Sequence, residues 1–453
     1  MNHFLVRLGI VSPSLLALAL GSCTTAPSAG ERQARRDVEH VGAALEVRPS
    51  LPQLTPESPL QDHVRFAVLN HPEVRAAYLD WRAAVSAIAP NRALPDPQLT
   101  FQADIADTIM ALMPGVMFDF MAPAKRVAMA NEALGSAAVA YRAYVGAVLG
   151  VAARVRKSAI ELAYVDQALA LRDEAIAALD QATDVARAEY STTAGMATFE
   201  TQVRLTNEVA KARSEIAALG DRRVAARARF KASLGLTPSD PDPAWPRLTL
   251  VATALPGDDE LWQRTRAANP DLGRMRAMVD MAMAGVGVAR NAGIPDFTVG
   301  AMADLKAEPL MVRPTATVTL PIWREKIRSN IAAAKARHDA AAARVSAEEI
   351  AMAASLAQML YMVRESDRMI EYIDRTALPN YERSIASVEA SYQSGMGGAG
   401  MIPEIRAMQV LMRLERLGAL RDRETAVTDL MLMTADAAPV DPALFAGADA
   451  NAR

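Results

Sequence analysis

The sequence has little of several residue types on which common enzyme and binding sites depend. Cysteine occurs once in 453 residues, so no intrachain disulfide can form. Histidine occurs five times and aromatic residues make up 5% of the chain. Basic and acidic residues number 49 and 52, a net charge of −3, which gives no electrostatic basis for binding nucleic acid. A glycine-rich phosphate loop, a zinc-ligand spacing and a nucleophile elbow are also missing.

The N-terminus has the shape of a secretory signal peptide. Arg7 precedes an apolar run at 8–20, which is too short for a transmembrane helix. The run ends in Leu20-Gly21-Ser22-Cys23, which resembles the bacterial lipobox, where the cysteine is acylated after cleavage. We therefore expect a signal peptide at 1–22 and a lipid anchor on Cys23, with Thr24 favouring sorting to the outer membrane. The alternative is an ordinary signal peptide with an incidental cysteine.

The body of the chain is a tandem repeat. A Pro- and Ser-rich stretch at 23–57 is interpreted as an extended tether. Beyond it, Asn91-Arg92-Ala93-Leu94-Pro95-Asp96 recurs 200 residues later as Asn291-Ala292-Gly293-Ile294-Pro295-Asp296. The pattern predicts a first repeat at 58–245, a second at 246–436, and a disordered Ala- and Asp-rich tail at 437–453.

Residues after each Pro-Asp pair alternate between apolar and polar, a period of two that is typical of strands. Strands are expected at 98–105 and 115–121, joined by a loop through 107–114, and at 297–305 and 315–320. One apolar and one polar face fit either a sheet packed on a core or a transmembrane barrel. The barrel is favoured because the flanking helices are too long to cover a sheet. Four strands are too few to close a barrel, so several chains must contribute.

Long helices make up the rest of each repeat, so the fold class is mainly α with a membrane β part. A helical hairpin is expected at 124–234 and another at 325–434, where Pro379 should kink the first helix. At about 1.5 Å per residue, the longest helix approaches about 100 Å. Helices of this kind pack side by side as a tube or bundle.

The layout resembles the TolC-type outer-membrane efflux proteins over about 59–434. The resemblance implies a homotrimer with a twelve-stranded β-barrel in the outer membrane and a helical tunnel, an α-barrel, across the periplasm. It also implies a passive exit duct served by a periplasmic adaptor and an inner-membrane pump. From the residues alone, eight or sixteen strands would also close a barrel. The best-matching pieces are Asn91-Arg92-Ala93-Leu94-Pro95-Asp96-Pro97, Ala122-Pro123-Ala124-Lys125-Arg126, Leu320-Pro321-Ile322-Trp323, Leu378-Pro379 and Tyr392-Gln393-Ser394-Gly395.

In such a duct, the functional residues line the pore or dock partners. Both helical turns are expected at the periplasmic end as adaptor contacts, although glycines in turns equally serve backbone conformation. The polar strand positions expected to line the barrel lumen are Gln102, Asp104, Asp119 and Asp304, and the adaptor contacts are Thr192, Thr193, Gly195, Gly395, Gly397 and Gly400.

The predicted periplasmic gate departs from the family pattern. Similar proteins often narrow this mouth with aspartates in a Val-Asp-Val-Leu-Asp-Ala segment. This sequence has Ile402-Pro403-Glu404-Ile405-Arg406-Ala407, so Pro403 and Arg406 stand where the aspartates would be. We therefore expect Glu404 and Arg406 at the gate.

The cargo and two other classes of protein stay open at this stage. Methionine occurs 23 times; thioethers suit Cu(I) or Ag(I), but methionine is also ordinary filler in helices. The sequence therefore does not name the cargo: a heavy-metal ion such as copper or silver, a drug and other substrates all stay open. No catalytic residue, cofactor or resident metal is predicted, because nothing gathers acidic groups together. A lipid-anchored periplasmic coiled-coil scaffold without a pore would explain the helices but not the four strands.

Overall fold

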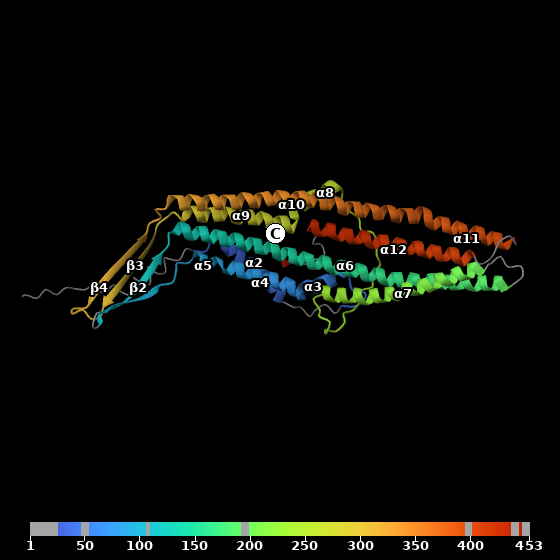
Figure 1. The fold of residues 1–453 in the computed structure, drawn as a ribbon, viewed down its shortest axis with the longest axis horizontal. Helices are drawn as coiled ribbons and strands as arrows, with labels where there is room; N and C mark the ends of the chain where they lie inside the picture. Colours follow the sequence, from blue (N-terminus) through green and yellow to red (C-terminus); the bar gives the residue numbers. More distant parts are fainter. Residues whose placement is uncertain are drawn as a thin grey trace, which may run out of the picture.

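The computed structural model describes residues 26–46, 54–105, 109–191, 199–394, 401–435 and 444–445. They form a long rod with the strands at one end and the ends of four long helices at the other (Figure 1). Cys23 and the two expected helical turns, at 192–198 and 395–400, lie outside the described residues.

Short helices open each repeat, and the repeated proline sets where one of them starts. Proline suits the first turn of a helix, where its missing N–H has no intrahelical partner. Just before Pro270, the Asn269 side chain accepts hydrogen bonds from the N–H groups of Asp271 and Leu272, both at 3.0 Å. The short helices are α3 (Leu60–Asn70), α4 (Pro72–Ser86) and α5 (Ile88–Arg92) in the first repeat, and α8 (Asp258–Ala268) and α9 (Pro270–Asn291) in the second.

The long helices follow the predicted hairpins to within a few residues. In the helical body, α12 packs against both α6 and α10, and α9 packs against the same two helices. Small residues allow this, since a Cβ on Gly135 of α6 would stand 2.8 Å from the Cα of Met281 in α9. The bounds are α6 (Pro123–Ser191), α7 (Phe199–Ser233), α10 (Arg324–Tyr372), α11 (Leu378–Gln393) and α12 (Met401–Met433).

The predicted interruption at Pro379 takes the form of a π-helical turn. This turn, η1 (Ile373–Ala377), joins α10 to α11 and ends just before Leu378. A proline inside a helix donates no hydrogen bond, and its ring crowds the preceding turn. The wider π turn is a common way for a helix to absorb an irregularity of this kind.

Four antiparallel strands form one sheet in the order β1-β2-β3-β4. The first strand, β1 (Gln98–Ile105), has the predicted bounds, and β3 (Asp296–Asp304) differs from its prediction by one residue at each end. The other two, β2 (Ile109–Phe120) and β4 (Met311–Thr319), begin earlier than predicted.

The loop predicted through 107–114 is wrong over its second part. Residues from Ile109 onwards pair with β1, with Met113 opposite Gln102 and Leu112 opposite Ala103. Pro114 suggested a loop because proline is rare inside strands. Here it lies opposite Phe101 in the ladder, so one proline does not end the strand.

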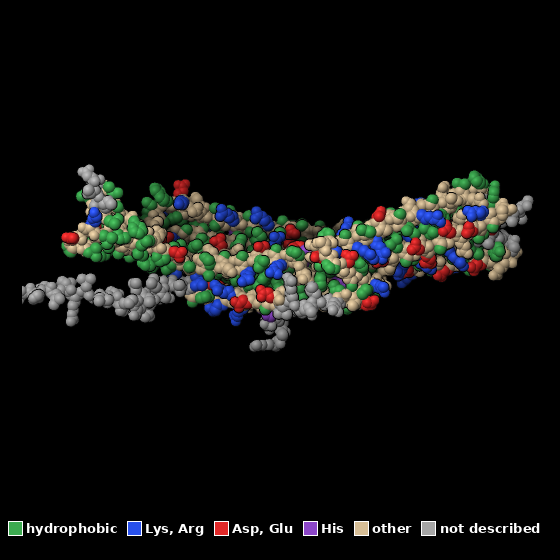
Figure 2. Space-filling view, turned by 90° about the horizontal axis from the view of Figure 1, so that it is seen from below, with side chains coloured by type: hydrophobic (Ala, Val, Ile, Leu, Met, Phe, Trp, Pro, Cys, Tyr) green, Lys and Arg blue, Asp and Glu red, His purple; other side chains and the backbone are tan. Residues whose placement is uncertain are grey.

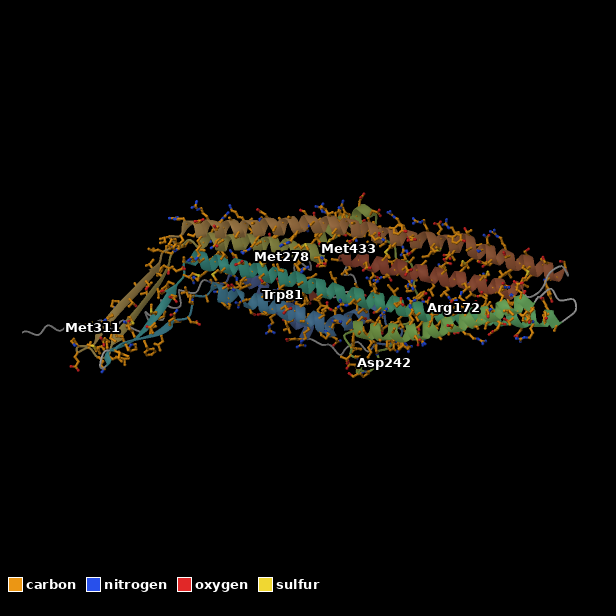
Figure 3. All side chains as sticks on the ribbon, viewed as in Figure 1. Trp81, Arg172, Asp242, Met278, Met311 and Met433 are labelled. Carbon is orange, nitrogen blue, oxygen red and sulfur yellow. The ribbon has the colours of Figure 1, made fainter. Side chains whose placement is uncertain are left out.

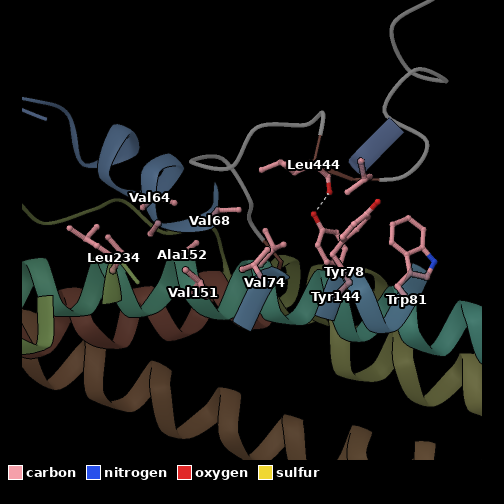
Figure 4. Close-up of a cluster of buried hydrophobic side chains, with 14 of the residues drawn as sticks. Val64, Val68, Val74, Tyr78, Trp81, Tyr144, Val151, Ala152, Leu234 and Leu444 are labelled. Atoms are coloured by element: carbon pink, nitrogen blue, oxygen red, sulfur yellow. Dashed lines mark hydrogen bonds between the residues drawn. The ribbon is translucent and has the colours of Figure 1, made fainter. Parts of the chain in front are cut away.

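A hydrophobic core lies midway along the rod, where α2, α3 and α4 cover α6 (Figure 4). Trp81 stacks on Tyr144 with ring centroids 5.7 Å apart, and Tyr78 meets Tyr144 edge to face at 6.3 Å. All three rings are buried. Their burial fastens the short helices to the longest helix of the chain.

The extended tether predicted at 23–57 is wrong for its described middle part. Ala29–Glu46 forms a helix, α2, whose Val38 and Val41 are buried in the core. Glu31, only 1% exposed, pairs with Arg35 at 2.8 Å and with Arg92 at 3.1 Å. Apolar residues at helical spacing and a paired acid therefore dock a segment whose flanking Pro and Ser residues suggested a tether.

The tail predicted to be disordered at 437–453 has two described residues, and both are packed. Leu444 is buried, and the Tyr144 hydroxyl donates a hydrogen bond to its carbonyl oxygen at 3.1 Å (Figure 4). Burial also raises the pKa of Tyr144. The prediction is wrong at this point because a Leu-Phe pair in an Ala- and Asp-rich tail is enough to fill a place in the core.

Candidate functional site

One face of the sheet carries all four side chains predicted to line a lumen. Residues directly opposite in an antiparallel ladder point to the same face, and alternate residues of a strand share a face. The pairings therefore place these four on one surface, called here the polar face. Its members are Gln98, Thr100, Gln102, Asp104, Ala111, Met113, Gly115, Met117, Asp119, Asp296, Thr298, Gly300, Met302, Asp304, Met311, Arg313, Thr315, Thr317 and Thr319.

Two of the predicted acids are held by neighbours on the polar face. Asp119 accepts hydrogen bonds from Gln98 at 2.8 Å and from the Thr298 hydroxyl at 2.5 Å. Asp304 is buried, accepts from the Lys306 N–H at 3.1 Å, and lies 3.7 Å from Arg313. Gln102 and Asp104, by contrast, are exposed.

Methionines on this face are packed over glycines, a feature that the sequence did not reveal. A Cβ on Gly115 would stand 2.3 Å from Cγ of Met302, and one on Gly300 would stand 2.8 Å from Cγ of Met117. Met311 lies at the far end of the sheet (Figure 3). In the described part of the chain, no group of three His, Cys, Asp or Glu side chains could hold a metal ion.

The opposite face of the sheet is apolar and exposed. Phe101 is 70% exposed and Leu99 66%, and Val299 and Val318 are also exposed. Figure 2 shows hydrophobic side chains gathered over the strand end of the rod. A continuous apolar surface of this kind marks contact with a membrane or another protein.

At the other end of the rod, Glu404 joins the two repeats. Arg204 of α7 donates two hydrogen bonds to its carboxylate, at 2.7 and 3.1 Å, and this bonding raises the pKa of Arg204. Arg406, the second predicted gate residue, lies 3.5 Å from Glu389 of α11. Both predicted residues are therefore held in ion pairs.

Sequence reasoning did not single out Arg204. It lies 200 residues before Glu404, so no local pattern links the two. The repeat itself contains the signal, because the same offset relates the strands of the two repeats. A search for oppositely charged residues 200 positions apart, at equivalent positions of the two repeats, would have found Arg204 and Glu404.

Further ion pairs tie α12 to both of its neighbours. Arg416 binds Asp374 of η1 through two hydrogen bonds, at 2.6 and 2.9 Å. Arg413 reaches Glu174 of α6 at 3.2 Å. The π turn beside Pro379 is thus attached to α12 by charge as well as by packing.

Comparison with protein families gives a match over the second repeat of the chain. Residues 261–436 match the family model described as Outer membrane efflux protein. A search of curated protein sequences gives no match.

Solved structures of outer-membrane channels share the fold of the chain. CusC, from a study of transmembrane channel formation, is 15% identical, with a TM-score of 0.68 over 83% of this chain and 92% of that one. The Neisseria gonorrhoeae MtrE outer membrane channel is 17% identical, with a TM-score of 0.69 over 83% and 88%. The Campylobacter jejuni CmeC outer membrane channel is 12% identical, with a TM-score of 0.66 over 87% and 88%.

Proposed function

We infer that the chain is a member of the outer membrane efflux protein family, whose model matches residues 261–436, and that it is the outer-membrane channel subunit of a tripartite efflux system. One observation carries this inference. A sheet with an exposed apolar face, a polar opposite face and two edges that no other described strand pairs with stands at the end of a helical rod. Strands in lipid must have every backbone group paired, so a closed barrel of several copies is the form that suits this sheet.

The proposed assembly is a homotrimer that contributes four strands per chain to a twelve-stranded barrel. The exposed apolar face would contact outer-membrane lipid and the polar face would line the lumen, with Gln102, Asp104, Asp119 and Asp304 in contact with cargo. The long helices would continue the duct into the periplasm. The function is passive passage, with no bond made or broken by the channel.

The rival scaffold function has less support. A pore-free periplasmic scaffold would have no use for Phe101 and Leu99 side chains about two-thirds exposed on a regular sheet. The methionines give no specific support to metal cargo, since Met117 and Met302 cover glycines in the sheet. The proposal therefore leaves the cargo unspecified, with a heavy-metal ion, a drug or another substrate as the candidates.

The remaining roles belong to the two ends of the molecule. Cys23 would carry acyl chains that hold the N-terminus at the membrane, where each buried methylene contributes about 0.8 kcal/mol. A periplasmic adaptor linked to an inner-membrane pump would dock at the helical tips. The proposed contacts are Thr192, Thr193, Gly195, Gly395, Gly397 and Gly400.

Native mass spectrometry of the detergent-extracted protein tests the assembly and the anchor together. A trimer that carries acyl chains on Cys23 is the expected result, and a Cys23→Ser variant should remain trimeric without them. A water-soluble monomer would overturn the channel proposal. A trimer without acyl chains would overturn only the anchor.

We propose that the Arg204–Glu404 pair helps to hold the periplasmic mouth closed. Glu404→Gln or Arg204→Gln should raise the fraction of time for which the channel is open. The expected increase is about two- to fivefold for each ion pair lost, because a partly exposed ion pair contributes up to about 1 kcal/mol. The double variant should resemble the single variants, since the second change has no remaining partner. Single-channel open times measure the effect.

Arg187→Gln is the matched control for this gate. Arg187 pairs with Asp184 at 3.4 Å within α6, and both side chains are more than two-thirds exposed. The Arg187→Gln substitution removes an Arg–carboxylate ion pair, but this pair lies within one helix and does not connect two helices. Equal open times in the Arg187 and Glu404 variants would contradict the gate role.

A further inference from the structure

The two hairpins of the sheet have the same register over residues 98–104 and 298–304, up to a register shift after Asp104 in the first hairpin. Gln98 pairs with Met117 in the first hairpin, and Thr298 pairs with Thr317 in the second. Both partners are displaced by 200 residues. The two hairpins therefore have equivalent residue pairs. At the β2–β3 junction, the second strand of the first hairpin pairs with the first strand of the second hairpin.

The edges of the sheet are the same kinds of strand as those at this junction. β1 and β3 are the first strands of their hairpins, and β2 and β4 are the second strands. The two edge strands, β4 and β1, are therefore equivalent to β2 and β3, and could pair with each other as β2 pairs with β3. Neither edge has a strand partner among the described residues. We propose that β4 of one subunit pairs with β1 of a second copy of this chain in the register of the β2–β3 junction, an inference that rests on the proposed barrel.

The junction fixes each pair across this subunit seam. Phe118 pairs with Val299 and Met117 with Gly300 at the junction. The corresponding seam pairs Val318 with Leu99 of the partner subunit on the apolar face, and Thr317 with Thr100 of the partner subunit on the polar face. All four seam side chains are at present on open strand edges.

The paired part of the junction ends at Gly115 and Met302, and one hydrogen bond continues its register beyond them. The Leu305 N–H donates to the Leu112 carbonyl at 3.0 Å, so these two residues are a hydrogen-bonded pair. The next pair, Asp304 with Met113, is then a non-hydrogen-bonded pair, in which side chains lie closer together. The seam counterpart of this pair is Asp104 of the partner subunit with Arg313.

Opposite charges therefore meet across the seam. Arg313 is about half exposed and has one loose contact, to Asp304 at 3.7 Å. Asp104 is exposed, and the described residues supply it with no ion pair. Opposite charges directly across an antiparallel pair stabilise it. The seam would place three Arg313–Asp104 pairs in the barrel lumen and add a determinant of register.

Disulfide trapping in the full-length protein tests the seam. The Thr317→Cys/Thr100→Cys variant should give disulfide-linked dimers and trimers on non-reducing gels. Within one chain the two positions lie three strand spacings apart, about 14 Å, too far for a disulfide. The control, Thr317→Cys/Gln102→Cys, keeps both cysteines on the polar face but shifts the register by two residues, and should give little product. Both variants are made with Cys23→Ser.

Each outcome separates the seam from the channel. Cross-linking of the Thr317/Thr100 pair alone supports the proposed register. Cross-linking of the shifted pair, or of neither pair in a protein that is still trimeric, overturns the register and leaves the channel proposal standing. A monomer that cross-links in neither variant overturns both. A double-variant cycle with Arg313→Gln and Asp104→Asn adds a second test: the two losses of heat-resistant oligomer should be non-additive, and additive losses would overturn the ion pair.

Discussion

Replacing Phe101 with arginine is expected to prevent assembly in the outer membrane, while replacing its neighbour Gln102 with arginine is expected to leave assembly intact. Both side chains are exposed on β1, but they lie on opposite faces of the sheet. An arginine on the lipid face of a barrel costs about 2 to 4 kcal/mol at the bilayer midplane, and three copies would carry it. The amount of heat-resistant oligomer in outer-membrane fractions should fall more than tenfold for Phe101→Arg.

The matched Gln102→Arg variant should assemble and reduce cation conductance, because its charge would lie in the lumen. This comparison separates the barrel from the pore-free scaffold. On the surface of a water-soluble scaffold, both substitutions would be equally harmless. Equal oligomer from the two variants would therefore contradict the assignment of the two faces.

Replacing Gly300 with valine is expected to break the β2–β3 junction. A Cβ at this position would stand 2.5 Å from the Val116 carbonyl oxygen and 2.8 Å from Cγ of Met117. A flexible methionine can move, but the carbonyl belongs to the strand backbone, so the sheet itself must shift. Overpacking of this kind costs about 1 to 3 kcal/mol. Thermal unfolding in detergent, followed by circular dichroism, should show a lower midpoint and less oligomer.

Gly287→Ala is the control for this substitution. Gly287 lies inside α9, and a Cβ there would meet no atom within 4 Å. Alanine favours a helix interior over glycine by about 1 kcal/mol, so the variant should be as stable as the parent or slightly more stable. A Gly300→Val protein that unfolds at the same temperature as this control would contradict the close approach.

Much of the fold could be predicted because its strongest patterns are local. The alternation from Gln98 to Ile105 gave a strand with the right bounds, since a period of two is visible within eight residues. The helical hairpins were found to within a few residues because long runs rich in Ala, Arg, Leu and Glu leave few other structures. The first hairpin has no proline, and the second continues through Pro379 and Pro403. The family resemblance predicted from these parts is confirmed by the family model, which matches residues 261–436, and by the fold that the chain shares with CusC and MtrE.

The missed features depend on contacts between distant segments. Residues 109–114 were predicted as a loop because the pattern around Pro114 is broken, and only pairing with β1 reveals a strand. Leu444 lies in an Ala- and Asp-rich tail, and its place in the core depends on Tyr144, 300 residues earlier. No single-sequence period encodes such contacts.

The candidate site shows the same division. The faces of the four predicted acids follow from strand alternation, and the structure puts them on one surface. The partners of these acids, such as Thr298 beside Asp119, depend on the order of strands in the sheet. The 200-residue repeat was visible in the sequence, but its consequence for register required the observed ladders.

Single-channel recording in planar lipid bilayers tests the central claim most directly. The purified full-length protein is predicted to give discrete conductance steps, with longer openings in the Arg204→Gln/Glu404→Gln variant and lower cation conductance in Gln102→Arg. Protein that inserts into the bilayer but conducts in neither the parent nor the gate variant would contradict the account.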